Sequence, residues 1–171
     1  MRICVLSERL RRPFDEGIKN VAVGLIGALA ADHEVLALTC GGLDDAEYRI
    51  RNVDANRLFL SAALWDAVRH FAPQAILYVP TACGTVFSFM RGRVLRFYGC
   101  GACTALVTLQ PRPHTVWGKL LIGHLAPDLV LAQSRRTANA LSKLGCRTAL
   151  LPPAVDTQRF RPASLEEKAA L

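Results

Sequence analysis

The loop after the first apolar run has the residue types of an anion-binding site. It covers Ser7–Lys19, contains Arg9, Arg11 and Arg12, and places Gly17 just before an expected helix. Glycine lets the backbone approach a bound anion, and a helix N-terminus favours negative charge. Contact with a phosphate is one interpretation of this loop, and an ordinary solvated connection is the other. The sequence lacks the G-x-G-x-x-G and Walker lysine motifs of dinucleotide and P-loop sites.

Three other polar segments follow expected strands, namely Thr81–Thr85, Gln110–Lys119 and Ser134. Ligands of an open parallel sheet bind beyond the carboxyl ends of its strands, so these segments are expected to border a site. Gln110 can hydrogen-bond a ligand hydroxyl but does not titrate near neutral pH, whereas histidine does. His114 is therefore a weak catalytic candidate, and a solvated loop histidine is the alternative.

The six cysteines do not form a recognisable metal site. Cys4, Cys40 and Cys103 lie in apolar runs, and Cys100-Gly-Ala-Cys103 is a single C-x-x-C without a second pair or paired histidines. We expect reduced thiols that serve packing, no metal and no cofactor, with metal or redox use of the C-x-x-C as the alternative. The sequence opens on a strand-like run instead of a signal peptide, so a cytoplasmic protein is expected.

The chain has 21 basic and 14 acidic side chains in 171 residues, a net charge of +7. A basic balance favours anionic partners such as phosphates, anionic lipid headgroups or nucleic acids. Nucleic acid is not expected, because no recognised nucleic-acid-binding module is present. No apolar run reaches the roughly 18 residues that a membrane-spanning helix needs.

The segment Val86–Tyr98 interleaves aromatic side chains with Arg91, Arg93 and Arg96. A basic amphipathic helix of this kind can lie on anionic lipid, which would place the protein peripherally at the inner face of the membrane. The alternative is a helix that covers the sheet and has an exposed arginine edge.

Short, continuous apolar runs alternate with helical patterns along the chain. The runs predict parallel strands covered on both faces, with Tyr48–Val53 as a weaker edge strand. The alternation implies right-handed βαβ units, hence a Rossmann-like, doubly wound α/β sheet of about seven strands with helices on both faces. Pro73, Ser134 and Gly145 predict a helix end, an N-cap and a C′ position. The other expected strands are Ile3–Leu6, Glu34–Thr39, Ala75–Val79, Thr104–Leu109, Asp128–Ala132 and Thr148–Leu151, and the amphipathic helices are Lys19–Asp32, Arg57–Phe71 and Arg135–Leu144.

The end of the sequence has the pattern of a domain exit. A proline pair follows the run Thr148–Leu151 and ends it, and the text then continues as Val155-Asp156-x-x-x-Phe160-x-Pro162. We expect a domain over residues 1–162 and, over 163–171, a linker to an absent C-terminal domain.

Three separated blocks, taken in order, resemble the N-terminal domain of GT-B retaining glycosyltransferases of family 4. The first includes Glu16–Asn20 and Asp32–Val35, the second is Ala126–Ser134, and the third is Pro152–Pro162. The resemblance covers essentially the whole chain. It implies half of an enzyme that transfers a sugar from a nucleotide-diphosphate donor to an acceptor hydroxyl with retention, without a required metal.

The resemblance also implies a division of labour. The N-terminal domain of such enzymes mainly binds the acceptor, and the C-terminal domain holds most of the nucleotide-sugar site. This chain is thus expected to bind a sugar or lipid-linked acceptor and to be inactive without a C-terminal domain. By resemblance, the donor-phosphate side of the cleft comprises Gly17, Ile18, Lys19 and Ser134, the acceptor side comprises Arg9, Arg12, Thr81, Gln110 and His114, and the hinge comprises Pro153, Asp156 and Phe160.

Two positions depart from the family pattern and leave the catalytic residues unassigned. Gln110 stands where many relatives carry histidine, and Pro153-Ala154 replaces the usual asparagine-glycine. A second function therefore stays open, that of a stand-alone binding or scaffold subunit that pairs with a separate catalytic chain. It predicts an exposed apolar patch around Gly17, Gln110 and Pro153. A nucleotide-dependent oxidoreductase is disfavoured, because the glycine fingerprint is missing.

Overall fold

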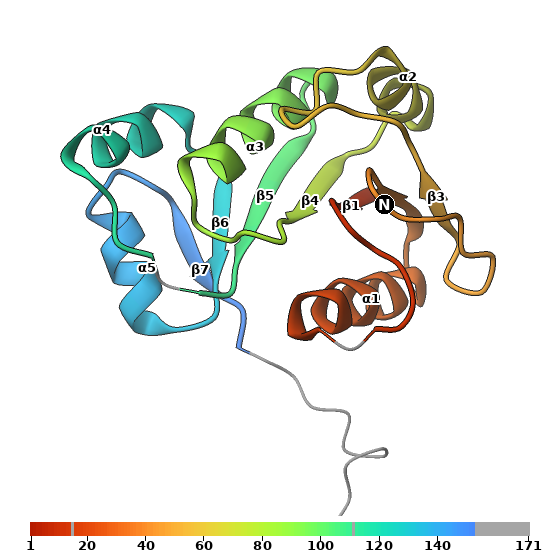
Figure 1. Cartoon of the computed structure of the whole chain (residues 1–171), viewed down its shortest axis with the longest axis horizontal. Helices are drawn as coiled ribbons and strands as arrows, with labels where there is room; N and C mark the ends of the chain where they lie inside the picture. The colour runs from red at the N-terminus through yellow and green to blue at the C-terminus, as the bar shows by residue number, and fades with distance from the viewer. Residues whose placement is uncertain (15, 111, 153–171) are drawn as a thin grey trace, which may run out of the picture.

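The computed structural model defines residues 1–14, 16–110 and 112–152 (Figure 1). Strands and helices alternate along this part of the chain, as the apolar runs predict. The strands are β1 Arg2–Ser7, β2 Glu34–Thr39, β3 Ile50–Asn52, β4 Ala75–Val79, β5 Cys103–Thr108, β6 Leu129–Ala132 and β7 Thr148–Leu150. The helices are α1 Gly17–Ala30, α2 Ala62–Phe71, α3 Val86–Tyr98, α4 Val116–Leu125 and α5 Arg135–Ser142.

All seven described strands form one parallel sheet in the order β3-β2-β1-β4-β5-β6-β7. The order reverses between β1 and β4, so the chain builds outward to β3 on one side and to β7 on the other. This confirms the doubly wound α/β sheet. The expected edge strand Tyr48–Val53 is also confirmed, as the short strand β3 at one end of the sheet.

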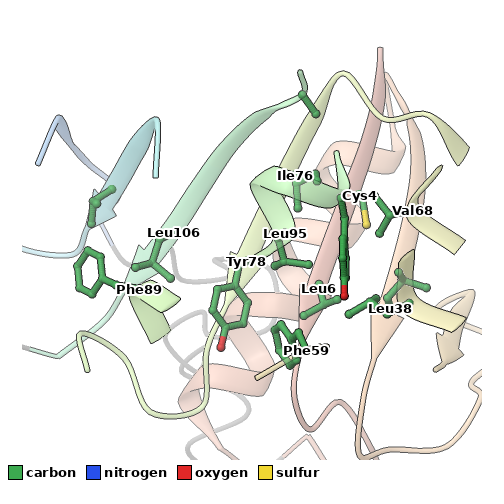
Figure 2. Packing of buried hydrophobic residues seen from close by; sticks show 14 of the residues in the cluster. Cys4, Leu6, Leu38, Phe59, Val68, Ile76, Tyr78, Phe89, Leu95 and Leu106 are labelled. Atoms are coloured by element: carbon green, nitrogen blue, oxygen red, sulfur yellow. The ribbon is translucent and has the colours of Figure 1, made fainter. Parts of the chain in front are cut away.

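Helices cover both faces of the sheet. Figure 1 shows α2, α3 and α4 along one side and α1 on the opposite side. Strand side chains alternate between two apolar clusters, because successive residues point to opposite faces. Leu6 and Tyr78 belong to the cluster under α2, α3 and α4, part of which is drawn in Figure 2, whereas Val5 and Leu77 pack with α1. The segment Val86–Tyr98 is thus a sheet-covering helix, α3, which buries Phe89 and Leu95.

The expected helix Arg57–Phe71 is shorter than predicted, because its first residues form a turn. The side chain of Asn56 accepts hydrogen bonds from the backbone N–H groups of Leu58 and Leu60 at 2.9 Å each. Ser61 then caps α2 by accepting from the Leu64 N–H at 3.2 Å. Helix α2 begins at Ala62 and ends before Pro73.

Helix α4 was not predicted, since the segment Gln110–Lys119 was expected to be a loop. Thr115 caps this helix by accepting from the Gly118 N–H at 3.2 Å. The two glycines of α4 weaken its helical propensity, which hides it in the sequence. The predicted cap of α5 is correct, because Ser134 accepts from the Thr137 N–H at 3.2 Å.

Gly123 lets α4 approach the turn between α5 and β7 closely. A Cβ atom at this position would lie 2.6 Å from the Leu144 carbonyl oxygen, a contact that only a backbone shift could relieve. Gly27, on the exposed side of α1, has open space around its Cα. A methyl group at Gly123 would therefore clash with the backbone, whereas a methyl group at Gly27 would meet no other atom.

We expect Gly123→Ala to lower the free energy of unfolding by about 1–2 kcal/mol, the cost of overpacking less the helical preference of alanine. The matched change Gly27→Ala should raise it by about 0.5–1 kcal/mol, because it removes backbone entropy without a clash. Urea unfolding of both variants measures the difference. A Gly123→Ala protein as stable as Gly27→Ala would show that α4 is not seated against this turn.

Candidate functional site

The point where the strand order reverses is occupied by a largely but not fully buried carboxylate, that of Glu8. Glu8 directly follows β1, and its side chain accepts hydrogen bonds from the Tyr78 hydroxyl at 2.8 Å and from the backbone N–H and hydroxyl of Thr81. Its other partner is the Arg91 guanidinium of α3, with which it forms an ion pair. The side chains of Glu8 and Arg91 are only 11% and 16% exposed. We refer to Glu8, Tyr78, Thr81 and Arg91 as the Glu8 network.

Arg91 connects this network to the loop between β3 and α2. It donates to the Arg57 carbonyl oxygen at 2.7 Å, and its guanidinium lies 5.4 Å from the centre of the Phe59 ring. Phe59 is buried and has a φ of 64°, a conformation that bulky residues rarely adopt. Edge-to-face packing on Tyr78, at 5.3 Å between ring centres, helps to hold it there.

The Glu8 network has the electrostatics of a structural anchor. Burial, followed by the charge of Glu8, raises the pKa of Tyr78 well above its ordinary value. Burial lowers the pKa of Arg91, but the hydrogen bond with Tyr78 and the charge of Glu8 outweigh it, so this pKa is also raised. Tyr78 stays protonated and Arg91 stays charged at neutral pH, so neither is prepared for proton transfer. Thr81, expected at the acceptor side, donates its hydrogen bonds to Glu8.

A separate cleft of about 440 Å³ lies beyond the carboxyl ends of β5 and β6, between the loop that leaves β5 and helix α5. It brings together Gln110 and His114, the two acceptor-side candidates that the sequence placed in one loop. It also contains two arginines that the sequence analysis did not single out, Arg112 and Arg136. Its described lining consists of Gly84, Thr108, Gln110, Arg112, Pro113, His114, Arg136, Thr137, Ala140, Leu141 and Leu144.

His114 is the titratable group of the cleft. Partial burial, and then the positive charge of Lys119, lowers the pKa of the imidazole below its ordinary value. Its neutral form therefore predominates at pH 7, and a neutral ring has one nitrogen that accepts a hydrogen bond. His114 can thus accept from a ligand hydroxyl, and Gln110 can both donate and accept.

Three of the four expected donor-phosphate residues lie in the first turn of α1, outside the described lining of the cleft. Gly17 is the exposed first residue of α1, while Ile18 is half-buried in the cluster beneath that helix. The Lys19 ammonium is buried, 3.3 Å from both the Pro13 carbonyl oxygen and the Glu16 carboxylate. The carboxylate of Glu16, at the N-cap, adds negative charge where a phosphate was expected.

The remaining arginine and serine candidates have local structural contacts. Arg12 hydrogen-bonds Asp45 at 2.8 Å and also pairs with Glu47, and its hydrogen bond lowers the pKa of Asp45. Arg9 is exposed, and Ser134 caps α5 next to the cleft. The hinge candidates Pro153, Asp156 and Phe160 lie outside the described residues.

The arginines of α3 are not a free basic edge. Arg91 belongs to the Glu8 network, and Arg96 pairs with Asp128 at 3.1 Å. Arg93 is exposed, and within residues 1–14, 16–110 and 112–152 it has no ion pair. Of the three arginines expected on a lipid-facing edge, Arg91 is held inside the fold, Arg93 and Arg96 are exposed, and contact with lipid stays a prediction.

The expectation that the cysteines serve packing is correct for some of them and wrong for others. Burial raises the pKa values of Cys4 and Cys40 to about 12, so both thiols are unreactive at neutral pH. Cys100 and Cys103 are exposed instead, and all six cysteines are free. No group of three metal-ligating side chains occurs in the part of the chain that the structure describes.

The sequence did not predict the Glu8 network or the two arginines of the cleft, and the reason is the same for both. Each depends on which loops are neighbours in space, and the order of the strands sets that arrangement. Glu8 did carry a signal, since it immediately follows a central strand. Arg136 carried another, as the second residue of the predicted helix after Ser134.

No protein-family model matches this sequence, and no curated protein matches it either. The parallel α/β fold is therefore shown by the structure itself. Function has to be argued from the side chains of the cleft.

Removal of either charge of the buried pair should destabilise the fold, because the partner is left uncompensated. We expect Glu8→Gln and Arg91→Gln each to lower the free energy of unfolding by about 3 kcal/mol, and the double variant to lose less than the sum. The control is Arg96→Gln on the same helix, whose ion pair is 44% exposed at the arginine and should contribute less than about 1 kcal/mol. Denaturant unfolding gives all four values, and equal losses for Glu8→Gln and Arg96→Gln would refute the anchor.

Proposed function

We propose that this chain is the acceptor-binding domain of a retaining GT-B glycosyltransferase, which works with a second domain that supplies the nucleotide sugar. The observation that supports it best is the cleft beyond β5 and β6. It contains Gln110 and His114, two of the five residues that the resemblance assigns to the acceptor side, whereas Arg9, Arg12 and Thr81 are not in its described lining. Its volume of about 440 Å³ lies within the range of small-molecule sites.

The cleft residues are suited to binding and orienting a sugar. The Gln110 amide can hydrogen-bond two hydroxyls at once, and the neutral His114 ring can accept from the hydroxyl that attacks the donor. No carboxylate is present in the described lining, so these residues offer neither a carboxylate nucleophile nor a carboxylate base. We therefore assign the breaking and forming of bonds at the donor sugar to groups of the donor itself and of the second domain.

Exposed apolar side chains close to the cleft bear on the scaffold alternative, because α4 begins two residues after His114. That alternative requires an exposed apolar patch around Gly17, Gln110 and Pro153. The largest group of exposed apolar side chains in the described residues lies on α4 instead, at Val116, Trp117, Leu120 and Leu121. The cleft combines arginines, Gln110 and His114 with apolar side chains such as Leu141 and Leu144, so its lining does not separate a polar ligand from a protein partner.

Ligand titration of this chain, followed by two-dimensional NMR, tests the proposal. Sugars and simple glycosides should shift the resonances of Gly84, Gln110 and His114, and nucleotide sugars should bind this chain weakly. Gln110→Ala should weaken sugar binding about 2- to 10-fold, as expected for one lost hydrogen bond. Asn139→Ala, also exposed and on α5 but outside the cleft lining, serves as the control.

The protein encoded by the complete reading frame completes this test. It should transfer labelled sugar from a nucleotide sugar with retained anomeric configuration, which NMR of the product detects. Sugars that shift only residues outside the cleft, or a full-length protein without transfer to any acceptor tested, would refute the proposal.

We further propose that the outer face of α4 contacts an anionic membrane surface. Val116, Trp117, Leu120 and Leu121 are exposed on it, and Trp117 is 78% exposed. The neighbouring turn of α3 adds Phe87, whose sequence neighbour Val86 lies beside Gly118. We refer to these five exposed side chains as the α4 face. Among the described residues, no helix is long and apolar enough to cross a membrane.

Charge favours lipid as the partner of the α4 face. From Ala67 to Pro152 the sequence has ten lysines and arginines but a single acidic residue, Asp128, which pairs with Arg96. Exposed tryptophan and leucine beside Lys119, an exposed cation on α4 itself, suit the interface of an anionic bilayer, where the ring sits at headgroup level and cations attract the lipid. The paired arginines of α3 are not needed for this contact.

The fluorescence of Trp117 can report on this contact directly. The chain has two tryptophans, so in a Trp65→Phe variant Trp117 is the single tryptophan that fluoresces. Its fluorescence should shift to the blue with phosphatidylglycerol vesicles and remain unchanged with phosphatidylcholine vesicles. Trp117→Ala with Leu120→Ser should weaken co-sedimentation by at least about 10-fold, given the apolar area lost. Phe97→Ala removes a ring that is also 78% exposed at the far end of α3 and should have little effect. Equal losses for both variants, or no binding to anionic vesicles, would exclude the α4 face.

A further inference from the structure

The cleft beyond β5 and β6 has an unbalanced positive charge. Arg112 and Arg136 approach it from two different elements, the loop after β5 and the first turn of α5, and no acidic side chain is present in its described lining. Glu8 already pairs with Arg91, and Asp128 precedes β6 at the opposite edge of the sheet, where it pairs with Arg96. Neither carboxylate therefore neutralises the two arginines.

A buried hydroxyl in the cleft lacks a partner. The Thr108 side chain is 1% exposed and borders the cleft, and its Oγ1 atom has no hydrogen bond within the described residues. Ser7 and Thr104 also have unpartnered hydroxyls, but they do not line the cleft. The Thr108 side chain therefore forms part of the wall of the cleft, but its Oγ1 atom has almost no accessible surface and does not by itself indicate a ligand.

The N-terminus of α5 adds a second feature of the same sign. Thr137 and Arg136, in the first turn of this eight-residue helix, line the cleft. The positive end of a helix favours an anion. Two guanidinium groups and the first turn of α5, with no carboxylate in the described lining, fit a ligand with several negative oxygens better than a neutral sugar.

We propose that this cleft binds a phosphate ester, with Arg112 and Arg136 on the phosphate and Gln110 and His114 on the part that carries it. The two arginine charges match the dianion of a phosphomonoester, and their planar forks suit phosphate oxygens. Only the name of the ligand rests on the proposed function, in which the phosphate ester is the sugar acceptor. The anion site itself follows from the cleft alone.

The test compares four probes on this chain by calorimetry and NMR, namely glucose 6-phosphate, glucose, glucuronic acid and uridine diphosphate. Glucose 6-phosphate should bind at least about 10-fold more tightly than glucose, and higher salt should weaken it. Tighter binding of glucuronic acid than of glucose 6-phosphate would show that the arginines recognise a carboxylate instead of a phosphate. Tighter binding of uridine diphosphate would assign the arginines to a nucleotide donor. Either result overturns the inference.

Neighbouring arginines on α5 provide a matched control. Arg112→Gln and Arg136→Gln should each weaken glucose 6-phosphate binding at least about 10-fold and weaken glucose binding much less. Arg135→Gln removes the same charge from the next residue of α5, which is exposed but outside the cleft lining, and should have only a small effect. Equal losses of affinity for Arg135→Gln and Arg136→Gln would show that only the overall positive charge attracts the ligand, and would overturn the site. Circular dichroism confirms that each variant folds.

His114 supplies a readout that is independent of affinity. In the free chain its pKa lies below the ordinary value, because of burial and of Lys119, and Arg112 and Arg136 also border its cleft. A bound phosphate favours the protonated ring, so glucose 6-phosphate should raise the His114 pKa in an NMR titration, and glucose should not. An unchanged pKa would overturn the placement of the phosphate beside His114.

The two proposals fail in different experiments. Binding of glucose without any gain from the phosphate would remove the anion site and leave the acceptor cleft in place. Phosphate-dependent binding, with no sugar transfer by the complete reading frame, would keep the anion site and refute the glycosyltransferase.

Discussion

The ion pair between Glu8 and Arg91 holds the centre of this fold together. At the neighbouring strands β1 and β4 the two halves of the sheet build in opposite directions, so the loops that leave them diverge. Glu8 joins these loops by accepting from Tyr78 and Thr81, and Arg91 adds α3 and the carbonyl of Arg57. A carboxylate that is 11% exposed is tolerated only because its oxygens are fully engaged.

The same ion pair determines where a ligand can bind. Open α/β sheets generally bind ligands at the point where the strand order reverses, but here the Glu8 network fills that point. The cleft described above lies beyond β5 and β6, the next two strands after β4. The segment that leaves Thr81 leads to Gly84, which lines the cleft and has a φ of 68°. A Cβ there would lie 3.4 Å from the Gln110 carbonyl oxygen, so the anchored loop also limits the width of the cleft.

The sequence predicts the elements of this fold better than its site. Continuous apolar runs identify the buried strands because both faces of a parallel strand are covered, and Ser134 identifies α5 because its hydroxyl caps the helix. Helix α4 was missed because Gly118 and Gly123 lower its propensity, although close packing against Leu144 requires one of them. The early turn at Phe59 was missed because burial against Tyr78 and Arg91 overrides the local preference of a phenylalanine. Gln110 and His114 were placed correctly because they share a loop, whereas the arginines that accompany them come from two elements.

The cleft and the α4 face are joined by a very short piece of chain. His114 lines the cleft, Thr115 caps α4, and Val116 begins the exposed face. A bilayer that received Trp117 would therefore lie close to the mouth of the cleft, because one residue separates His114 from the first side chain of that face. A phosphate ester anchored in such a bilayer would present its polar end at that depth, and Arg112 stands on the same loop. A lipid-linked phosphate is the acceptor that would satisfy both proposals at once, and the loop Arg112–Thr115 is the element that joins the cleft to the α4 face.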